Sequence, residues 1–534
     1  MVKWKEELKS ELTPSYHLYQ DALSNQLRMG LRVKIPECVD FYEGRQWPPA
    51  TENTKNLPRP VVNVVKMICR SKKGAILSTP VKIHYKSYSP YTDIERFNAF
   101  ATSVFREIGQ DELDRLAIDD AIKKGSYFFH YFWDKESISR ESGEVGALSC
   151  ELIDPLNIFF ANPAETNEQK QDWIMISSRI KTEKIKNMAD PDADTTLLMP
   201  DGDENDNKTT LLTRYFRVGN DVFCERQTKF CIISKPFNII PAPFDKKSKA
   251  QGGKRKERIL YPIVCGQYER RENSIYGMGE VEGLIPNQKA INFNIAMSLL
   301  NAQQCAWGKY VALPNALNGQ KISNVPGQVL VDFSGTGEGI KRLPEAELSR
   351  APMELTTALE ELTRSVSGAS SVMTGEISGT SLSGAAIAYL QSQAQVPIEE
   401  LKSSFWFAKR KQGMVVAQFL KHFYLKHAYI KINPDKGCDG VFDEFSSRDF
   451  ESSLFEVYVE AIGGTKASLA SDISLLDTCL KAGKISLETY IRAYPASAIT
   501  NKEEILKQIK LEKDSEVEIL RKELKELKEK YAEF

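Results

Sequence analysis

One stretch of the chain is polar and yet almost free of charge. Between Arg364 and Glu399 lie 34 residues with a single charged side chain, Glu376. Because 27% of the whole chain is charged, about nine charged residues would be expected there. The stretch consists largely of glycine, alanine, serine and glutamine, and its serines and glutamines are Ser365, Ser367, Ser370, Ser371, Ser378, Ser381, Ser383, Gln391, Gln393 and Gln395. This composition favours either a loop or a helix that packs closely through small side chains.

Helical patterns lie on both sides of this stretch. One helix is expected over 350–366 and a long one over about 383–424, with Pro397 inside it as the cause of a kink. Upstream, Pro286 fits the first turn of an amide-rich helix that runs to about Cys305. Residues 306–345 are rich in turn formers, and short strands are expected there at 310–314 and 328–332.

The first 260 residues mix helical and strand patterns, and shorter elements follow the long helix. Pro60 suits the first turn of a helix. Helices are expected at 60–77, as a pair over 94–124 and as a pair over 468–493; strands are expected at 81–85, 127–133, 148–153, 173–180, 211–217, 222–234 and 455–461. A short heptad seam closes the chain, at Val517, Leu520, Leu524, Leu527 and Tyr531. Together these elements predict an α+β fold.

Length and charge narrow the classes of protein. A chain of 534 residues allows about three or four structural units. No run of 18 or more uncharged apolar residues is present, and the charged N-terminus lacks the apolar core of a signal peptide, so a cytoplasmic origin is expected. Lys+Arg number 71 against Asp+Glu 72, a balance that argues against tight, sequence-blind DNA binding but leaves loose contact with DNA open.

No motif for catalysis, cofactors or metals stands out. The nine cysteines form no CxxC pair and are expected to be free, buried thiols. The loop Gly335–Gly339 lacks the pattern of a nucleotide-binding motif. The acidic segment 190–206 has Asp206 where an EF-hand requires glycine, which favours a surface loop. The sequence therefore predicts no catalytic residue, no cofactor and no metal site.

Several short motifs occur in a characteristic order. They are Tyr42-x-Gly44-x-Gln46-Trp47, Pro60-Val61-Val62-Asn63, Ile153-Asp154-Pro155-Leu156-Asn157-Ile158-Phe159 before Gln171-Asp172-Trp173, and Tyr276-Gly277-x-Gly279 leading to Gln288-x-x-Ile291-Asn292. The uncharged stretch and the kinked helix follow them. In this order and spacing the chain resembles a portal protein of a tailed bacteriophage, over most of its length.

The resemblance implies a portal-type architecture. It implies a wing at 1–260 completed by strands at 426–462, a first stem helix within 261–305, a clip at 306–349 and a second stem helix at 350–366. A tunnel loop at 367–382, a long kinked helix at 383–425 and a helical crown at 463–534 would follow. The last helix is expected to pack against its neighbours in the crown, or alternatively to form an independent coiled-coil tether.

The resemblance also implies a function. Portal proteins form rings, twelve-fold in the virion, at one vertex of the capsid, and double-stranded DNA passes through them in packaging and ejection. The implied partners are further copies of the chain, the large terminase subunit, a head–tail adaptor, and the major capsid and scaffolding proteins, with no membrane. The implied location is the virion after assembly in the host cytoplasm.

Two sets of side chains become hypotheses for sites. A channel that must release DNA should avoid a dense lining of cations, because each phosphate contact adds affinity. The expected lining is Lys289, Ser370, Ser371, Glu376, Ser378, Ser381, Ser383 and Gln391. The expected docking residues of the clip are Lys309, Asn315, Asn318, Lys321, Lys341 and Arg342.

Both sets also have purely structural interpretations. The uncharged stretch would also suit helix packing, and each lysine would also suit a solvated surface. Two other functions stay open at this point. One is a different ring-forming connector of the virion, without terminase docking, and the other is a nucleotide- or metal-dependent phage enzyme that uses the loop Gly335–Gly339 and nearby acidic residues.

Overall fold

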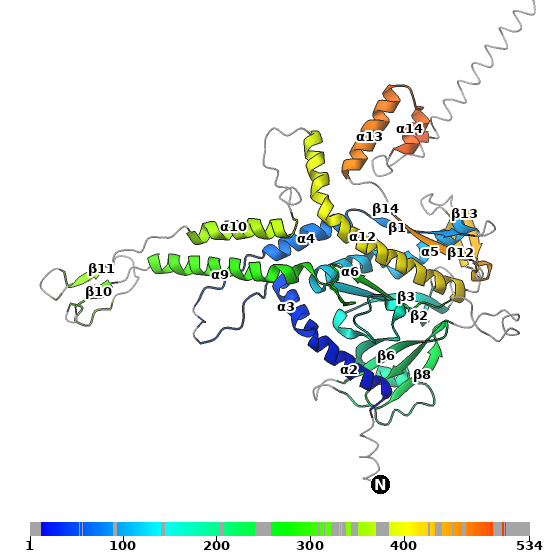
Figure 1. The fold of residues 1–534 in the computed structure, drawn as a ribbon, viewed down its shortest axis with the longest axis horizontal. Helices are drawn as coiled ribbons and strands as arrows, with labels where there is room; N and C mark the ends of the chain where they lie inside the picture. Colours follow the sequence, from blue (N-terminus) through cyan, green and yellow to red (C-terminus); the bar gives the residue numbers. More distant parts are fainter. Residues whose placement is uncertain are drawn as a thin grey trace, which may run out of the picture.

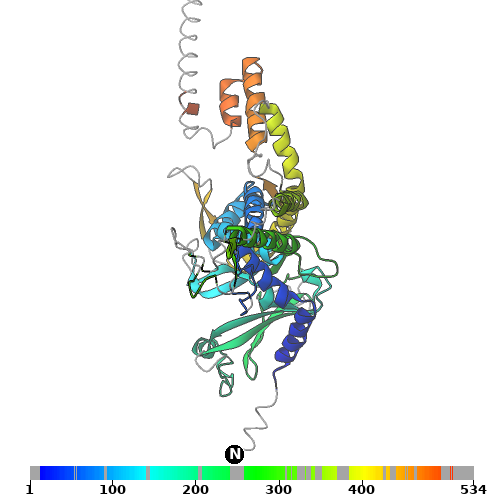
Figure 2. The same cartoon turned by 90° about the vertical axis from the view of Figure 1, so that its left-hand side faces the viewer.

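The chain folds into an α+β body with a two-helix arm (Figure 1), which confirms the expected class. The computed structural model describes residues 12–494 together with 505, 506 and 508, except for 53, 56, 89–92, 140–144, 202–206, 241–257, 307–309, 314–315, 322–330, 332, 334–337, 343–350, 370–383, 425–427, 433–440, 451–452, 454 and 462–465. Figure 2 shows the body in layers, with a β-sheet and helix α2 at one end, helices in the middle, and α13 and α14 at the other end.

Among the described residues, five helices precede the two larger sheets along the chain. They are α2 (Pro14–Arg28), α3 (Leu31–Glu43), α4 (Val64–Leu77), α5 (Ile94–Ile108) and α6 (Gln110–Lys124). The expected pair over 94–124 is confirmed as α5 and α6, which meet at Gly109 with a φ of 73°. Such a left-handed conformation favours glycine because it has no Cβ. The buried faces of α3, α4, α5 and α6 contribute to the largest apolar core of the body.

Two antiparallel sheets, of three and five strands, form most of the described β structure of the body. The smaller has the order β3-β2-β9, and the larger has the order β4-β5-β6-β7-β8. The strands are β2 (Ser126–Ile138), β3 (Val145–Ile153), β4 (Ile158–Phe160), β5 (Trp173–Lys181), β6 (Lys208–Val218), β7 (Asp221–Gln227), β8 (Ile232–Asn238) and β9 (Ile263–Gln267). Apolar side chains of both sheets share a second core, which includes Phe128, Ile174 and Tyr215.

A buried histidine joins the two sheets. Nδ1 of His130 on β2 lies 2.8 Å from a carboxylate oxygen of Glu151 on β3, and its Nε2 lies 2.7 Å from the hydroxyl of Tyr215 on β6. The hydrogen bond to His130 is the main cause of a lowered pKa for Glu151. The ionised carboxylate therefore stabilises the native arrangement.

The contact between Glu151 and His130 should make the free energy of unfolding depend on pH. A carboxyl group with a lowered native pKa stabilises the fold above its unfolded pKa, near 4.3, and loses that contribution as pH falls through the native value. Because the Glu151 side chain is 51% exposed, we expect only about 0.5 kcal/mol. Urea unfolding of wild type and Glu151→Gln should differ at pH 6 and converge near pH 3. A constant difference across this range would contradict the assignment.

Segments far apart in sequence complete the body. Strand β1 (Val81–Ser87) pairs with β14 (Phe455–Ala461), and β12 (Ala428–Ile432) pairs with β13 (Val441–Phe445). Between them, Phe97 stacks on Phe455 with ring centroids 4.2 Å apart, and Phe100 stacks on Phe445 at 4.0 Å. Helix α12 (Gly384–Phe423) crosses this region, where the Tyr85 hydroxyl donates to the carbonyl of Gly413 at 3.0 Å. The body thus depends on both halves of the chain.

The arm consists of α9 (Glu280–Ala306) and α10 (Ala351–Val366), which lie side by side in Figure 1. At its tip, β10 (Tyr310–Ala312) pairs with β11 (Ile340–Arg342).

Figure 1 shows α12 as a bent helix, and Pro397 lies within it as expected. The expected pair over 468–493 is confirmed as α13 (Lys466–Lys481) and α14 (Leu487–Ala493), with Gly483 between them at a φ of 66°.

Three element predictions are wrong in detail. The helix expected from Pro60 begins at Val64, because the side chain of Asn63 accepts a hydrogen bond from Lys66 N and caps the helix there. The helix expected from Pro286 begins earlier, at Glu280, with the proline inside it. The single strand expected at 222–234 is two strands, β7 and β8, which are separated by a turn. The strand at 328–332 and the heptad seam at 517–531 lie mostly or wholly outside the described residues.

Candidate functional site

The base of the arm contains a buried network of amide side chains. On α9, Gln288 is fully buried, and its Oε1 accepts from the backbone N–H groups of Val64 and Val65 at 3.1 and 3.2 Å. Its Nε2 donates to the carbonyl of Val62 at 2.7 Å and to Oδ1 of Asn292 at 3.0 Å. All hydrogen-bonding positions of this amide are therefore used.

The same network caps helix α4 from outside. The first N–H groups of a helix have no partner within it. Here Gln288 accepts the first two, from Val64 and Val65, and Asn63 accepts the third, from Lys66 at 2.9 Å. A side chain of the arm thereby completes a helix of the body.

Asn292 extends the network to the motif around residue 46. Its Nδ2 donates to Oε1 of Gln46 at 2.6 Å, and Nε2 of Gln46 donates to the carbonyl of Phe41 at 2.8 Å. The Trp47 indole N–H donates to the carbonyl of Pro60 at 2.8 Å. Three of the sequence motifs therefore meet at one place, where α3, α4 and α9 join.

The glycines of a further motif permit close backbone contact. A Cβ on Gly277 would lie 2.7 Å from the carbonyl oxygen of Glu269 and closer still to that of Gly125. A Cβ on Gly279 would lie 2.7 Å from the carbonyl oxygen of Ile122. These glycines bring the end of α6 against the chain that leads into α9, so they fix where the arm begins.

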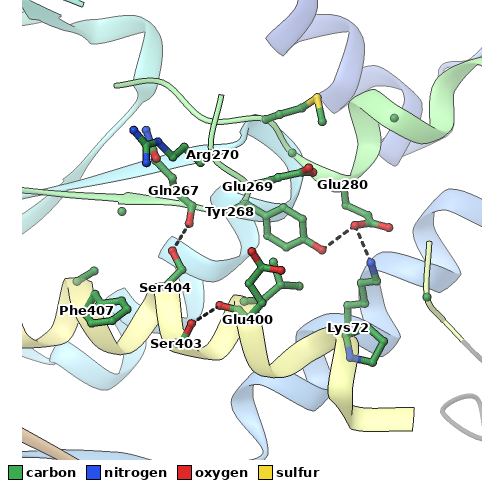
Figure 3. Close-up of a pocket in the computed structure, with 18 of the residues that line it drawn as sticks. Lys72, Gln267, Tyr268, Glu269, Arg270, Glu280, Glu400, Ser403, Ser404 and Phe407 are labelled. Carbon is green, nitrogen blue, oxygen red and sulfur yellow. Dashed lines mark hydrogen bonds and ion pairs between the residues drawn. The ribbon is translucent and has the colours of Figure 1, made fainter. Parts of the chain in front are cut away.

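A cavity of about 770 Å³ lies beside this junction (Figure 3). Its lining comes from α4, the segment that follows β9, the start of α9, the end of α10 and α12. In Figure 3, Lys72 and Tyr268 both point to Glu280, whose carboxylate lies 2.7 Å from the lysine Nζ and 2.7 Å from the phenol oxygen. Burial and this carboxylate raise the pKa of Tyr268 well above its ordinary value. The ionisable groups at this end of the cavity thus neutralise one another, which suits a structural role.

Helix α10 exposes an apolar stripe. It packs chiefly against α9, and its buried positions include Thr356 and Thr363. On another face, Leu355, Leu362 and Val366 recur at helical spacing with exposures of 52%, 59% and 76%. An amphipathic helix normally buries such a stripe. We call Leu355, Leu362 and Val366 the α10 stripe.

Two more apolar areas are exposed nearby. On α9, Phe293 and Met297 lie four residues apart and are 58% and 46% exposed; we call them the α9 stripe. On α12, Val396 and Phe407 are also exposed, at 60% and 65%. Phe407 of α12 and Val366 of the α10 stripe both line the cavity.

The structure describes only part of the expected channel lining. Lys289 lies on α9, where its Nζ is 2.8 Å from Glu37 and 5.2 Å from the ring centroid of Phe41. Its charge is therefore already paired within the chain. Gln391 lies in α12, with its side chain outside the described residues. The others lie outside the described residues altogether: Ser370, Ser371, Glu376, Ser378, Ser381 and Ser383.

The expected docking residues lie near the tip of the arm where they are described. Asn318 and Lys321 lie in exposed turns between β10 and β11. Lys341 is exposed on β11 and pairs with Glu338 at 2.6 Å. Arg342 ends the same strand, and its side chain lies outside the described residues. Lys309 and Asn315 also lie outside the described residues.

The described residues offer no metal site. No group of three or more His, Cys, Asp or Glu residues there is arranged to hold an ion. In the acidic segment, Asp190 and Asp201 accept backbone N–H groups of Lys235 and Thr210, both at 2.9 Å. Most of the loop Gly335–Gly339 and residues 202–206 lie outside the described part. Among the described helices, none is long and apolar enough to cross a membrane.

Sequence reasoning missed the roles of the amides and the apolar stripes. It noted the amide-rich helix over 286–305 and the motif Gln288-x-x-Ile291-Asn292, but not that these amides face the body. The apolar spacing of residues 355–366 was readable, yet periodicity cannot tell whether a stripe packs within one chain or between chains.

Comparison with known proteins identifies the class. Residues 245–445 match the family of phage P22-like portal proteins. This match confirms the resemblance to portal proteins of tailed phages over these residues.

Other comparisons add little. A search of curated proteins gives no significant match. A chain in the virion of a native gene transfer agent particle is 9% identical with a TM-score of 0.38, and the alignment covers 80% of this chain and 88% of that one. A chain in the neck of an empty gene transfer agent particle is 10% identical with a TM-score of 0.36, covering 80% and 87%. Because both TM-scores lie below 0.5, neither similarity carries an inference.

Proposed function

We propose that this chain is the subunit of a portal ring, through which double-stranded DNA enters and leaves a phage-like capsid. The family match and the exposed apolar stripes of the arm support the proposal. In this assignment α9 and α10 form the stem, β10 and β11 belong to the clip, the sheets and their helices form the wing, and α13 and α14 begin the crown. The ring would occupy one capsid vertex in the virion.

The stripes carry the proposal of a ring. The α9 stripe and the α10 stripe lie on different helices and have different shapes. Contact between unlike patches of neighbouring copies is heterologous, and it closes into a ring when the rotation per copy divides a full turn. Contact with a neighbouring copy would bury side chains as large as Phe293 and Leu362. Each Å² of apolar surface removed from water stabilises such a contact by about 25 cal/mol. Twelve copies, as in the virion of tailed phages, remain the expected number.

Weak attraction for DNA fits the charges of the chain. A net charge of −1 per copy avoids a strongly positive ring that would retain DNA. The pairing of Lys289 with Glu37 reduces the attraction of this residue for phosphate. The uncharged residues 365–398 remain our proposed wall or loop of the channel. Cryo-EM of an assembled ring would test this, and a position away from the central axis would reject it.

The tip of the arm is the proposed docking area. Val311 and Leu313 are exposed there beside the ion pair of Lys341 and Glu338. A mixed apolar and charged surface suits a protein partner. The large terminase subunit during packaging and a head–tail adaptor afterwards are the partners we propose, while capsid and scaffolding proteins would contact the body.

Substitution in the α10 stripe tests the ring. We expect Leu362→Glu to convert rings into single chains, because burying a carboxylate in an apolar contact is costly. Light scattering after gel filtration, with negative-stain imaging, measures the change. Ile232→Glu is the control, since Ile232 is 48% exposed on β8 and belongs to neither stripe. A wild-type chain that stays single under all conditions, or a ring too narrow for B-form DNA, would reject the proposed function.

A further inference from the structure

The amide network fixes the direction of the arm through directional contacts. Gln288 and Asn292 together make five hydrogen bonds to residues 62–65 and Gln46, in addition to the bond between them. Hydrogen bonds weaken when distance or angle departs from a narrow range, whereas apolar contacts tolerate sliding. Because Gln288 and Asn292 are almost fully buried, water cannot replace these bonds.

A ring requires such control because each copy has two separated apolar areas. One is on the arm, at Phe293, Leu355 and Leu362, and the other is on the body, at Val396 and Phe407. If both areas contact the next copy, both contacts must follow the same rotation. The angle between arm and body then decides which number of copies closes without strain.

We propose that Gln288 and Asn292 are positioning residues that set the arm angle and thereby the number of copies in the ring. This inference rests on the proposed function. Rings of twelve and thirteen copies differ by about 2° of rotation per copy. The two side chains are about 6 Å apart along α9, so a slip of about 0.3 Å between them tilts the helix by about 3°. The tolerance of a hydrogen bond is thus comparable to the difference between ring sizes.

The test compares subunit counts in rings of the full-length protein. Gln288→Leu with Asn292→Leu keeps similar side-chain volumes but removes the network. Native mass spectrometry and cryo-EM class counts should show at least a twofold rise in the share of rings with a subunit number other than the commonest wild-type one. A folded double variant with the wild-type distribution overturns the inference.

Gln412 supplies a matched control. It is fully buried on α12, and neither polar atom of its amide has a hydrogen-bond partner among the described residues. Gln412→Leu is therefore the same chemical change in a buried site without a network. We expect an unchanged ring distribution and a higher melting temperature. A shift in ring size equal to that of the double variant would overturn the role of the network.

A milder variant tests the inference if the double variant does not fold. Gln46→Met removes the bond from Asn292 to Gln46 and the bond from Gln46 to the Phe41 carbonyl, and it leaves the cap of α4 intact. If circular dichroism shows the double variant to be unfolded, the ring distribution of Gln46→Met decides: a shift supports the inference, and no shift overturns it. Wild-type protein that forms no ring would reject the proposed function itself.

Discussion

Asp114→Ala should lower the free energy of unfolding by about 3–5 kcal/mol, among the largest effects expected for one side chain here. Asp114 on α6 forms an ion pair with Lys409 on α12, and both side chains are about nine-tenths buried. The carboxylate also accepts from Gln110 at 2.9 Å, and Gln110 accepts from the Tyr131 hydroxyl at 2.8 Å. Removing the acid leaves a buried ammonium group without its counter-charge. Urea or thermal unfolding measures the loss.

A double variant separates the cost of an unpaired charge from the value of the pair. Asp114→Leu with Lys409→Met replaces both partners by apolar groups, and such replacements are often close to neutral. We expect it to be more stable than Asp114→Ala. The exposed pair of Glu338 and Lys341 is the surface control, and Glu338→Ala should change stability by less than about 1 kcal/mol. If the double variant loses as much free energy of unfolding as the single variants Asp114→Leu and Lys409→Met together, an unpaired buried charge is not the cause of the loss.

Gly277→Ala should lower the free energy of unfolding by about 3 kcal/mol. The added Cβ would lie 2.7 Å from the carbonyl oxygen of Glu269 and nearer to that of Gly125. Both neighbours are backbone atoms, so relief requires movement of the segment that follows β9 or of the end of α6. Thermal unfolding measures the loss, and loss of rings should accompany it, because the arm starts at this contact.

Gly74→Ala is the matched control for this prediction. Gly74 lies inside α4 with no atom within 4 Å of an added Cβ. In an open helical position alanine is favoured over glycine by about 0.5–1 kcal/mol. The same substitution should therefore stabilise one site and destabilise the other. Equal effects at both sites would show that backbone freedom, and not close contact, dominates.

Local patterns in the sequence predict most of the helices. The pair α5 and α6, the helix α10 and the long α12 with its proline follow from periodicity and from glycine or proline positions. Predictions fail where a distant side chain decides the outcome. The start of α4 is set by the Asn63 cap together with Gln288, which lies more than 200 residues away, so Pro60 alone misplaces it. The start of α9 depends on the contact of Gly277 with Gly125, which no local pattern reveals.

The site was predictable as a family resemblance and not as a set of contacts. The order of the motifs indicated a portal protein, which the family match confirms. The same motifs prove to be structural, since Gln46, Asn63, Gln288 and Gly277 hold the base of the arm. The proposed lining of the channel followed from composition alone, and most of it lies outside the described residues. Lys289 shows the limit of that reasoning, because its partner Glu37 is on another helix.

The pairing of β1 with β14 has a consequence for synthesis of the protein. Residues 81–87 cannot find their partner strand until residues 455–461 have left the ribosome. At about 5–20 residues per second, that delay is of the order of 20–75 seconds. Phe97 and Phe100 lack their stacking partners throughout this interval. The nascent chain therefore displays aromatic surface during this interval, and a truncated product that ends before residue 445 should aggregate.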